Sequence, residues 1–341
     1  MRTSLFSLIA FLMLSALPRA EEVDPLAGRP GTFLRMGAGS RAEAMGNAQT
    51  ALLEPTTVVA YWNPAMAVML GEPHVLASGY RFLTMGRRQG YLSYTNRIPP
   101  RMALSVAILY QGDHDIPIFD TDGNFTYTGG YMSLATHITL AYKVSKRLSF
   151  GINTAIFTST VNAGTGDENK ITTPGSSATI DLSAFYKLKK NFSLGLNVKQ
   201  VRGKSRWEVP TYGTEMNTVI AENLPMEVKF GAAWQGALKG RACAVTYDMD
   251  GFVVPLDNET FSWYRRLKDG RSLVEHHAGA EFFLYPEFPL RIGVSNSGGF
   301  SCGTGFYFST GSLKGSKLDY VFTVEPNSTG VENGVSWTYS W

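Results

Sequence analysis

The sequence predicts an all-β protein, an antiparallel transmembrane β-barrel of about fourteen strands with a small N-terminal hatch inside its lumen. Three observations predict this fold: apolar and small residues alternate along most of the chain, the alternating segments are even in number, and long connections alternate with short ones. The composition agrees, because only 17% of the residues are charged, against roughly 25% in soluble domains, while glycine and aromatic residues are abundant.

The alternation is clear at 148–156, where Phe150, Ile152 and Ile156 are separated by Gly151, Asn153 and other small residues. Successive side chains of a strand point to opposite faces, so one face is apolar and the other small or polar. Most segments approach the roughly 9–11 residues of a tilted membrane-spanning strand. They are predicted at 74–83, 88–97, 102–111, 133–143, 148–161, 176–187, 192–202, 225–236, 241–249, 274–284, 289–297, 300–308, 316–325 and 334–341.

The connections carry a second signal. From the third segment onward, we expect long connections at 112–132, 162–175, 203–224 and 250–273, alternating with short ones at 144–147, 188–191, 236–240 and 285–288. Membrane barrels have short turns on the periplasmic side and longer loops outside, which explains this asymmetry.

A secreted two-sheet sandwich is the alternative, since its strands alternate as well. The polar face of a sandwich meets water and favours Lys, Glu and Thr. Here that face is rich in Gly, Ser, Ala and Asn, which suits a crowded lumen, so the pattern favours the barrel.

Residues 1–20 are predicted to be a secretory signal peptide. Arg2 precedes an apolar stretch that is shorter than the roughly 20 residues of a spanning helix, and Ala20 is a small residue at a possible cleavage point. Pro18 fits an A-x-A site poorly, so the position of the cut stays open. We therefore expect a signal peptide at 1–20, a hatch segment at 21–72 and the barrel at 73–341.

Residues 31–70 do not alternate. They are dominated by Gly and Ala, Asn63-Pro64 marks a turn, and Arg41–Thr50 is expected to form one short helix. A segment with few charges and many small side chains suits packing inside a narrow lumen better than a separate domain outside it.

A family resemblance is carried by three motifs: RMGAGSRA at 35–42, MGNA at 45–48 and YWNPA at 61–65. Together they resemble the N-terminal hatch of the FadL-like outer-membrane proteins, particularly the PorV/PorQ branch. In that superfamily the hatch precedes a fourteen-stranded barrel. The resemblance covers effectively the whole predicted mature chain.

The resemblance implies passive import of hydrophobic molecules such as long-chain fatty acids, which bind beside the hatch and leave sideways into the membrane. Asn63, Pro64 and Ala65 match the hatch motif, next to Trp62, and are implied to border the passage for the ligand. The family motif continues with Gly where this chain has Met66, a larger apolar side chain that either narrows the passage or lines it. PorV itself is implied to bind secreted proteins within a secretion system.

The chain ends on GVSWTYSW, in which Val335, Trp337, Tyr339 and Trp341 share one face of a strand. Outer-membrane proteins commonly end on such a strand with a terminal aromatic residue. By that resemblance Trp337, Tyr339 and Trp341 form the signal for the barrel-assembly machinery.

Other motifs point to ordinary structural features. The dinucleotide-like GAGSRA at 37–42 lacks a preceding strand, and the calcium-like DTDGN at 120–124 has its glycine too early and reads as a hairpin tip. The neighbours His276 and His277 point to opposite faces of a strand and cannot chelate one metal. Cys243 and Cys302 are expected to act as small apolar side chains that fill space, and the sequence does not show whether they lie close together.

No catalytic motif, metal site or cofactor is predicted, and the absence of a basic tract argues against nucleic acid as a partner. Expected partners are outer-membrane lipid, a hydrophobic small molecule, the barrel-assembly machinery and, under the PorV-like alternative, secreted proteins. Loop aromatics either form interfacial girdles or contact a ligand; these are Trp207, Tyr212, Trp263 and Tyr264.

Two functions from different classes stay open. The first is passive transport of hydrophobic small molecules across the outer membrane. The second is a PorV-like protein-binding component of a secretion system. In either case the expected location is the outer membrane of a double-membraned bacterium.

Overall fold

The computed structural model describes residues 26, 30–54, 58–164, 170–210, 217–253, 272–295, 299–324 and 330–341. The predicted signal peptide at 1–20 lies outside the described residues. So do three of the loop aromatics, Tyr212, Trp263 and Tyr264.

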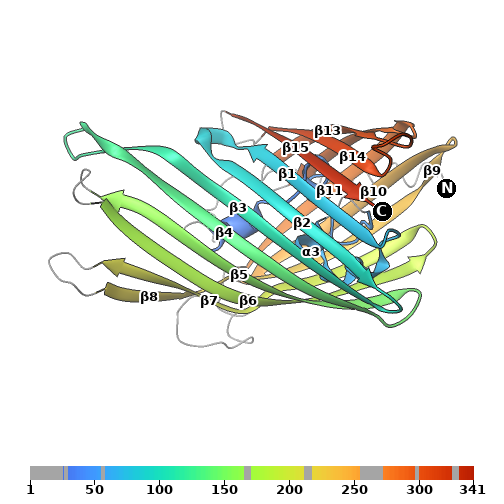
Figure 1. Cartoon of the computed structure of the whole chain (residues 1–341), viewed down its shortest axis with the longest axis horizontal. Helices are drawn as coiled ribbons and strands as arrows, with labels where there is room; N and C mark the ends of the chain where they lie inside the picture. The colour runs from blue at the N-terminus through green and yellow to red at the C-terminus, as the bar shows by residue number, and fades with distance from the viewer. Residues whose placement is uncertain are drawn as a thin grey trace.

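Within the described residues, fifteen strands form one antiparallel sheet that closes on itself, because β1 pairs with β15 and β6 pairs with β7 (Figure 1). The strands are β1 His74–Phe82, β2 Arg88–Ile98, β3 Met102–Phe119, β4 Phe125–Lys143, β5 Leu148–Gly164, β6 Lys170–Lys189, β7 Phe192–Pro210, β8 Asn217–Asn223, β9 Met226–Leu238, β10 Arg241–Val253, β11 Ser272–Tyr285, β12 Phe288–Ser295, β13 Gly299–Tyr307, β14 Ser316–Val324 and β15 Val331–Ser340. Closure excludes the open sandwich.

β8 lengthens the wall without widening it. β7 pairs with β9 over its first half, up to Lys199, and with β8 over its second half, from Lys204. β8 and β9 therefore hold one position around the barrel, one beyond the other, with Leu224 and Pro225 between them. Pro225 has no N–H to give to a ladder, so the strand breaks there. The wall has fourteen strands, as predicted.

The long loops expected at 112–132, 162–175 and 203–224 are wrong, because most of these residues form strands instead. The strands continue into them, so that β3 and β4 are joined only by residues 120–124, and three long hairpins, β3–β4, β5–β6 and β7–β8, reach past β1 and β15 (Figure 1). Continued pairing satisfies backbone groups that a loop would leave to water. The alternation weakens there, as at Gly129-Gly130, which hid these strands from a pattern search.

The opposite rim is built mostly from short turns, as expected, although the longer connection 308–315 joins β13 to β14 there. The short turns lie at 99–101, 144–147, 190–191, 239–240 and 286–287. Lys239 and Gly240 both have positive φ, at 51° and 79°, which is the conformation of a two-residue hairpin turn whose twist matches its strands.

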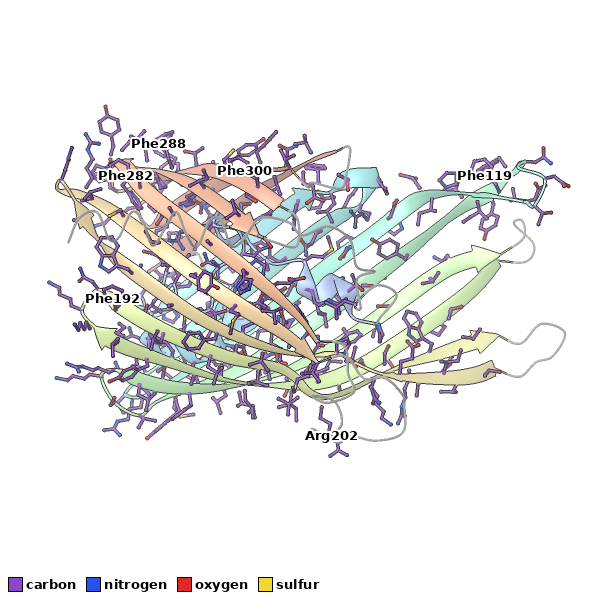
Figure 2. The ribbon with its side chains drawn as sticks, turned by 180° about the vertical axis from the view of Figure 1, so that it is seen from behind. Phe119, Phe192, Arg202, Phe282, Phe288 and Phe300 are labelled. Atoms are coloured by element: carbon purple, nitrogen blue, oxygen red, sulfur yellow. The ribbon has the colours of Figure 1, made fainter. Side chains whose placement is uncertain are left out.

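The outward face carries a continuous apolar band (Figure 2). Ile152 is 44% exposed, and large apolar side chains on the other strands are exposed to a similar degree, among them Leu104, Phe230, Ile292 and Tyr320. A monomeric soluble protein rarely exposes apolar patches beyond a few hundred Å², so this band indicates contact with lipid. No helix among the described residues is long and apolar enough to cross a bilayer.

The inward face is small, polar and buried. Ser105, Thr139, Ser149, Asn153 and Asn197 each have no exposed surface. They are buried because the N-terminal segment fills the lumen at their level.

Over its described residues this segment, the hatch, contains four short helices: η1 Thr32–Arg35, α2 Ser40–Ala44, α3 Val59–Trp62 and η2 Pro64–Met69. The expected helix at Arg41–Thr50 is wrong in length, because α2 ends at Ala44. Gly46 and Asn47 follow with φ of 65° each, a left-handed conformation that turns the chain away from the helix axis.

We predict that Ile152→Arg destabilises the barrel by about 2–4 kcal/mol, because it places a charge near the middle of the apolar band. Denaturant unfolding of the protein in lipid vesicles measures this loss.

Thr158→Arg is the matched control, since Thr158 is an exposed residue six positions further along β5, near the outer edge of the band. Its expected cost is below about 1 kcal/mol. Equal costs at the two positions would contradict the placement of the membrane.

Candidate functional site: the hatch and its seat in the barrel

The turn at Asn63 joins three parts of the molecule. Its backbone is extended, and its Oδ1 accepts the N–H of Ala65 at 3.1 Å, which caps η2 with Pro64 at the first helical position. Its Nδ2 donates to the carbonyl of Thr50 at 2.8 Å and to that of Ala184 on β6 at 3.2 Å. Asn63 is completely buried, and its bonds to Ala65 and Thr50 are shielded from water.

Trp62 and Tyr61 fold the earlier part of the hatch onto this turn. Trp62 Nε1 donates to the carbonyl of Ala38 at 2.8 Å, and the Tyr61 hydroxyl donates to the carbonyl of Leu34 at 2.6 Å. The two rings meet edge to face with centroids 4.9 Å apart. The YWNPA motif thus holds the hatch together and ties it to the wall.

Met66 has no exposed surface and lies in an apolar cluster. The hatch contributes Phe33, Leu34, Val59, Tyr61, Met66 and Leu70 to this cluster, and the wall contributes Ala103, Leu109, Ala135, Phe157 and Phe185 from β3, β4, β5 and β6. In this conformation Met66 fills space rather than bordering an open channel. Its role in a passage stays a prediction, as do those of Trp62, Asn63, Pro64 and Ala65.

Glycines of the wall make room for the hatch backbone. A Cβ on Gly195 of β7 would lie 2.0 Å from the carbonyl oxygen of Thr50, and one on Gly293 of β12 would lie 2.0 Å from the nitrogen of Gly46. Two more glycines are approached almost as closely by the hatch backbone: Gly151 by the nitrogen of Ala65 at 2.5 Å and Gly279 by the carbonyl oxygen of Met45 at 2.4 Å. No side chain fits at these contacts, which explains why the inward faces of the predicted strands are rich in glycine.

Buried ion pairs hold α2 to the wall on two sides. Arg41 binds Glu281 of β11 through two bonds of 3.0 and 2.8 Å, and Glu281 also binds Arg291 of β12 at 2.6 Å. On the other side, Glu43 binds Arg81 of β1 at 2.8 Å, and Arg81 binds Glu332 of β15 at 2.5 Å. Bidentate Arg–carboxylate pairs fix orientation as well as position.

A second charged group lies beside the aromatic pair of the hatch. Lys199 Nζ lies 4.0 Å from the centroid of the Tyr61 ring, and Lys229 Nζ lies 5.5 Å from that of Trp62. Glu227 pairs with both lysines, at 3.5 and 3.0 Å, and Lys229 also contacts Asp250. The hatch therefore meets β3–β6 through the apolar cluster together with uncharged hydrogen bonds, such as that from Asn63 to Ala184, and meets the strands on the opposite side through charged groups.

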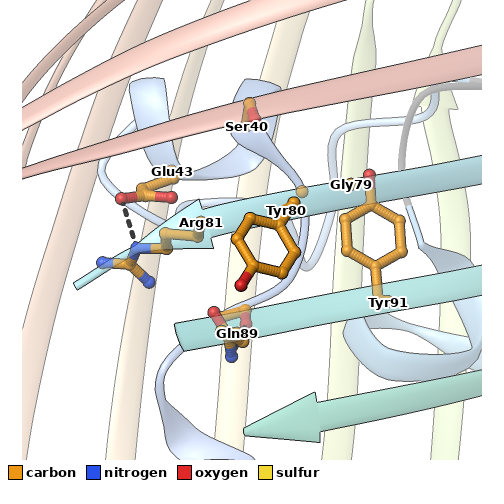
Figure 3. A pocket seen from close by; sticks show the side chains of 9 residues that line it. Ser40, Glu43, Gly79, Tyr80, Arg81, Gln89 and Tyr91 are labelled. Carbon is orange, nitrogen blue, oxygen red and sulfur yellow. Dashed lines mark hydrogen bonds and ion pairs between the residues drawn. The ribbon is translucent and has the colours of Figure 1, made fainter. Parts of the chain in front are cut away.

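A very small cleft of about 10 Å³ remains between the hatch and the wall (Figure 3). Its lining is polar or lacks side chains: Gly37, Gly39, Ser40, Glu43, Gly79, Tyr80, Arg81, Gln89 and Tyr91. Ligand sites usually occupy 300–1,000 Å³ and are mostly apolar, so this cleft does not suit a long hydrocarbon.

The predicted assembly residues lie on the outside of the seam where the barrel closes. Trp341 stacks on His74 of β1 with centroids 5.2 Å apart and on Tyr339 at 5.1 Å, and Tyr339 stacks on Trp337 at 6.1 Å. The backbones of His74 and Trp341 exchange two hydrogen bonds of 3.1 Å. Recognition by the assembly machinery stays a prediction.

The structure also shows where the remaining sequence motifs lie. Residues 37–42 lead into α2 inside the lumen, and 120–124 form a hairpin turn in which Asp120 Oδ1 accepts the N–H groups of Asp122 and Asn124. His277 is buried and contacts Asp250, whereas His276 stacks on Tyr247. Cys243 and Cys302 are free and lie on β10 and β13, which are not neighbours.

No group of three or more His, Cys, Asp or Glu residues among the described residues is arranged to hold a metal ion. The charged clusters of the lumen were missed from the sequence. Their signal was present, because Lys199 and Asp319 occupy the inward positions of predicted strands, where a charge needs a partner.

No protein-family model matches the chain, and no curated protein matches it in sequence. Solved structures match its fold. The Pseudomonas putida toluene transporter TodX is 12% identical with a TM-score of 0.62, the matched region covering 89% of this chain and 98% of TodX. The monoaromatic hydrocarbon channel CymD is 15% identical with a TM-score of 0.60 over the same shares.

A Pseudomonas aeruginosa FadL homologue is 11% identical with a TM-score of 0.56, covering 89% of this chain and 98% of that one. The chain therefore has the fold of the FadL and TodX channels: a closed antiparallel barrel of fourteen strands with a short helical segment at its N-terminal end.

We predict that Gly195→Val displaces the hatch, because its side chain would overlap the backbone at Thr50. Limited proteolysis or hydrogen exchange of residues 58–70 should show much faster cleavage or exchange in the variant.

Gly251→Val is the control, since a Cβ there meets nothing closer than 3.8 Å. A hatch equally protected in both variants would contradict the close seating described here.

Proposed function

We propose that this protein is an outer-membrane channel for the passive transport of hydrophobic small molecules. One observation carries the proposal: a lipid-facing barrel of fourteen strands has its lumen filled by an N-terminal hatch that packs on β3–β6 through a large apolar cluster. A water-filled pore for polar solutes would need an open lumen, whereas an apolar solute can replace apolar contacts between hatch and wall.

The fold similarity supports the same proposal. TodX is described as a toluene transporter and CymD as a monoaromatic hydrocarbon channel, and both share this fold at low sequence identity. We propose the same class of cargo for this chain, extending to longer molecules such as fatty acids, and the outer membrane of a double-membraned bacterium as its location.

The route we propose follows the apolar cluster. Met66 and Phe33 of the hatch face Phe157 of β5 and Phe185 of β6 in one cluster. The charged interface on the opposite side keeps α2 attached while this side loosens, because breaking a buried ion pair costs about 3–5 kcal/mol. A solute that enters here would border the YWNPA turn.

The test is uptake into vesicles whose outer leaflet is lipopolysaccharide. Protein-containing vesicles should admit a labelled monoaromatic hydrocarbon and a labelled fatty acid faster than empty vesicles, while a labelled sugar enters both at the same rate. No acceleration for any apolar solute would refute transport, and acceleration of the sugar would show an open pore instead.

We predict that Met66→Ala increases this uptake several-fold, because removing the side chain opens space in the apolar cluster. The same change should lower stability by about 2–5 kcal/mol. Met132→Ala removes an equal side chain from the outward face, where Met132 is 44% exposed, and should leave uptake unchanged. Unchanged or slower uptake by the Met66→Ala variant would show that Met66 does not border the passage.

A second candidate is a PorV-like protein-binding role. The long hairpins favour it: the tip of β3–β4 holds Phe119 and Phe125 edge to face at 6.2 Å, with 56% and 58% of their surfaces exposed. Exposed aromatic pairs are typical anchors of protein interfaces. If secreted proteins co-purify with the native protein, Phe119→Ala with Phe125→Ala should release them; retention would count against this role.

A further inference from the structure

Three basic side chains form a stripe on the outward face of β7. Arg202, Lys204 and Arg206 occupy alternate positions, so they share one face of the strand, and all three are exposed. Figure 2 shows Arg202 pointing away from the barrel. We call these three residues the basic stripe.

The basic stripe begins where the apolar band ends. Phe192 starts β7 at the rim of short turns, and the outward side chains of Phe192 and Leu196 are apolar and exposed. Arg202 follows Phe192 by ten positions, about the length of a strand that crosses the membrane. The strand shifts register near Gln200, between the membrane part and the extension that carries the stripe.

Uncharged residues lie beside the basic stripe on both neighbouring strands. Within the described residues none of the three cations forms an ion pair. On β6 they lie opposite Ile180, Ala178 and Ser176, and on β8 opposite Asn223 and Ala221, all uncharged. One acid, Glu208, ends the row on the same face.

We infer that the basic stripe binds the phosphate groups of lipids in the leaflet opposite the short turns. Cations at the edge of an apolar band reach the level of the headgroups, where an anionic surface attracts them. Arginine suits phosphate through paired N–H donors. Under the proposed location this leaflet is the outer one, so the ligand is a multiply phosphorylated glycolipid.

This inference rests on the proposed membrane, but it does not require transport. Its test is native mass spectrometry of the purified full chain with bisphosphorylated lipid A and with the same lipid lacking both phosphates. We expect the protein to retain lipid A and to release the phosphate-free form. The triple variant R202Q/K204Q/R206Q should bind lipid A at least tenfold more weakly.

The matched control is K146Q/K189Q/K190Q, which removes the same charge from exposed lysines at the rim of short turns. It should keep the affinity for lipid A, and a heat-dependent gel shift shows whether both variants are folded. Equal binding by the stripe variant, an equal loss in the control, or equal retention of the phosphate-free lipid would each overturn the inference. If the protein binds lipid A but does not accelerate solute uptake, transport is refuted while the lipid-binding role of the basic stripe is supported.

Discussion

Every part of this structure depends on one constraint, that backbone N–H and C=O groups facing lipid must find partners within the wall. The pairing of β1 with β15, from Val75 opposite Ser340 to Phe82 opposite Asn333, removes the last free edges. Closing a wall of fourteen strands sets the width of the lumen. That width leaves a space that side chains of the wall alone do not fill, and the hatch occupies it.

The hatch meets the wall by two different means. Glycines such as Gly195 and Gly293 let its backbone approach closely, and ion pairs such as Arg41–Glu281 fix its orientation. Apolar contacts are non-directional and tolerate sliding, whereas a bidentate ion pair holds one geometry. The ion pairs lie on one side of the hatch, whereas its side against β3–β6 combines apolar packing with uncharged hydrogen bonds such as Asn63–Ala184.

The strands could be predicted because alternation is strong wherever one face meets lipid and the other a crowded lumen. Phe150, Ile152 and Ile156 show this, and the fourteen predicted segments correspond to the fourteen strands of the wall. The hairpin extensions could not be predicted in this way, because beyond the membrane neither face of a strand needs to be apolar. β8 is an example, with Val219 and Ile220 both exposed on successive positions.

Only part of the candidate site could be predicted from the sequence. The YWNPA turn was recognisable as a motif, but the pairing of Asn63 with Thr50 and Ala184 depends on how distant segments meet. The partners of inward charges were hidden for the same reason. Lys199 and Glu227 lie on β7 and β9, and only their register places them side by side.

The hydrogen bonds between His74 and Trp341 make the wall a ring with adjacent ends. Joining residue 341 to residue 74 by a short linker and opening the chain at a turn such as 239–240 would give a circularly permuted barrel without the hatch. In topological terms the hatch is an appendage to a complete ring, and it could be supplied as a separate peptide.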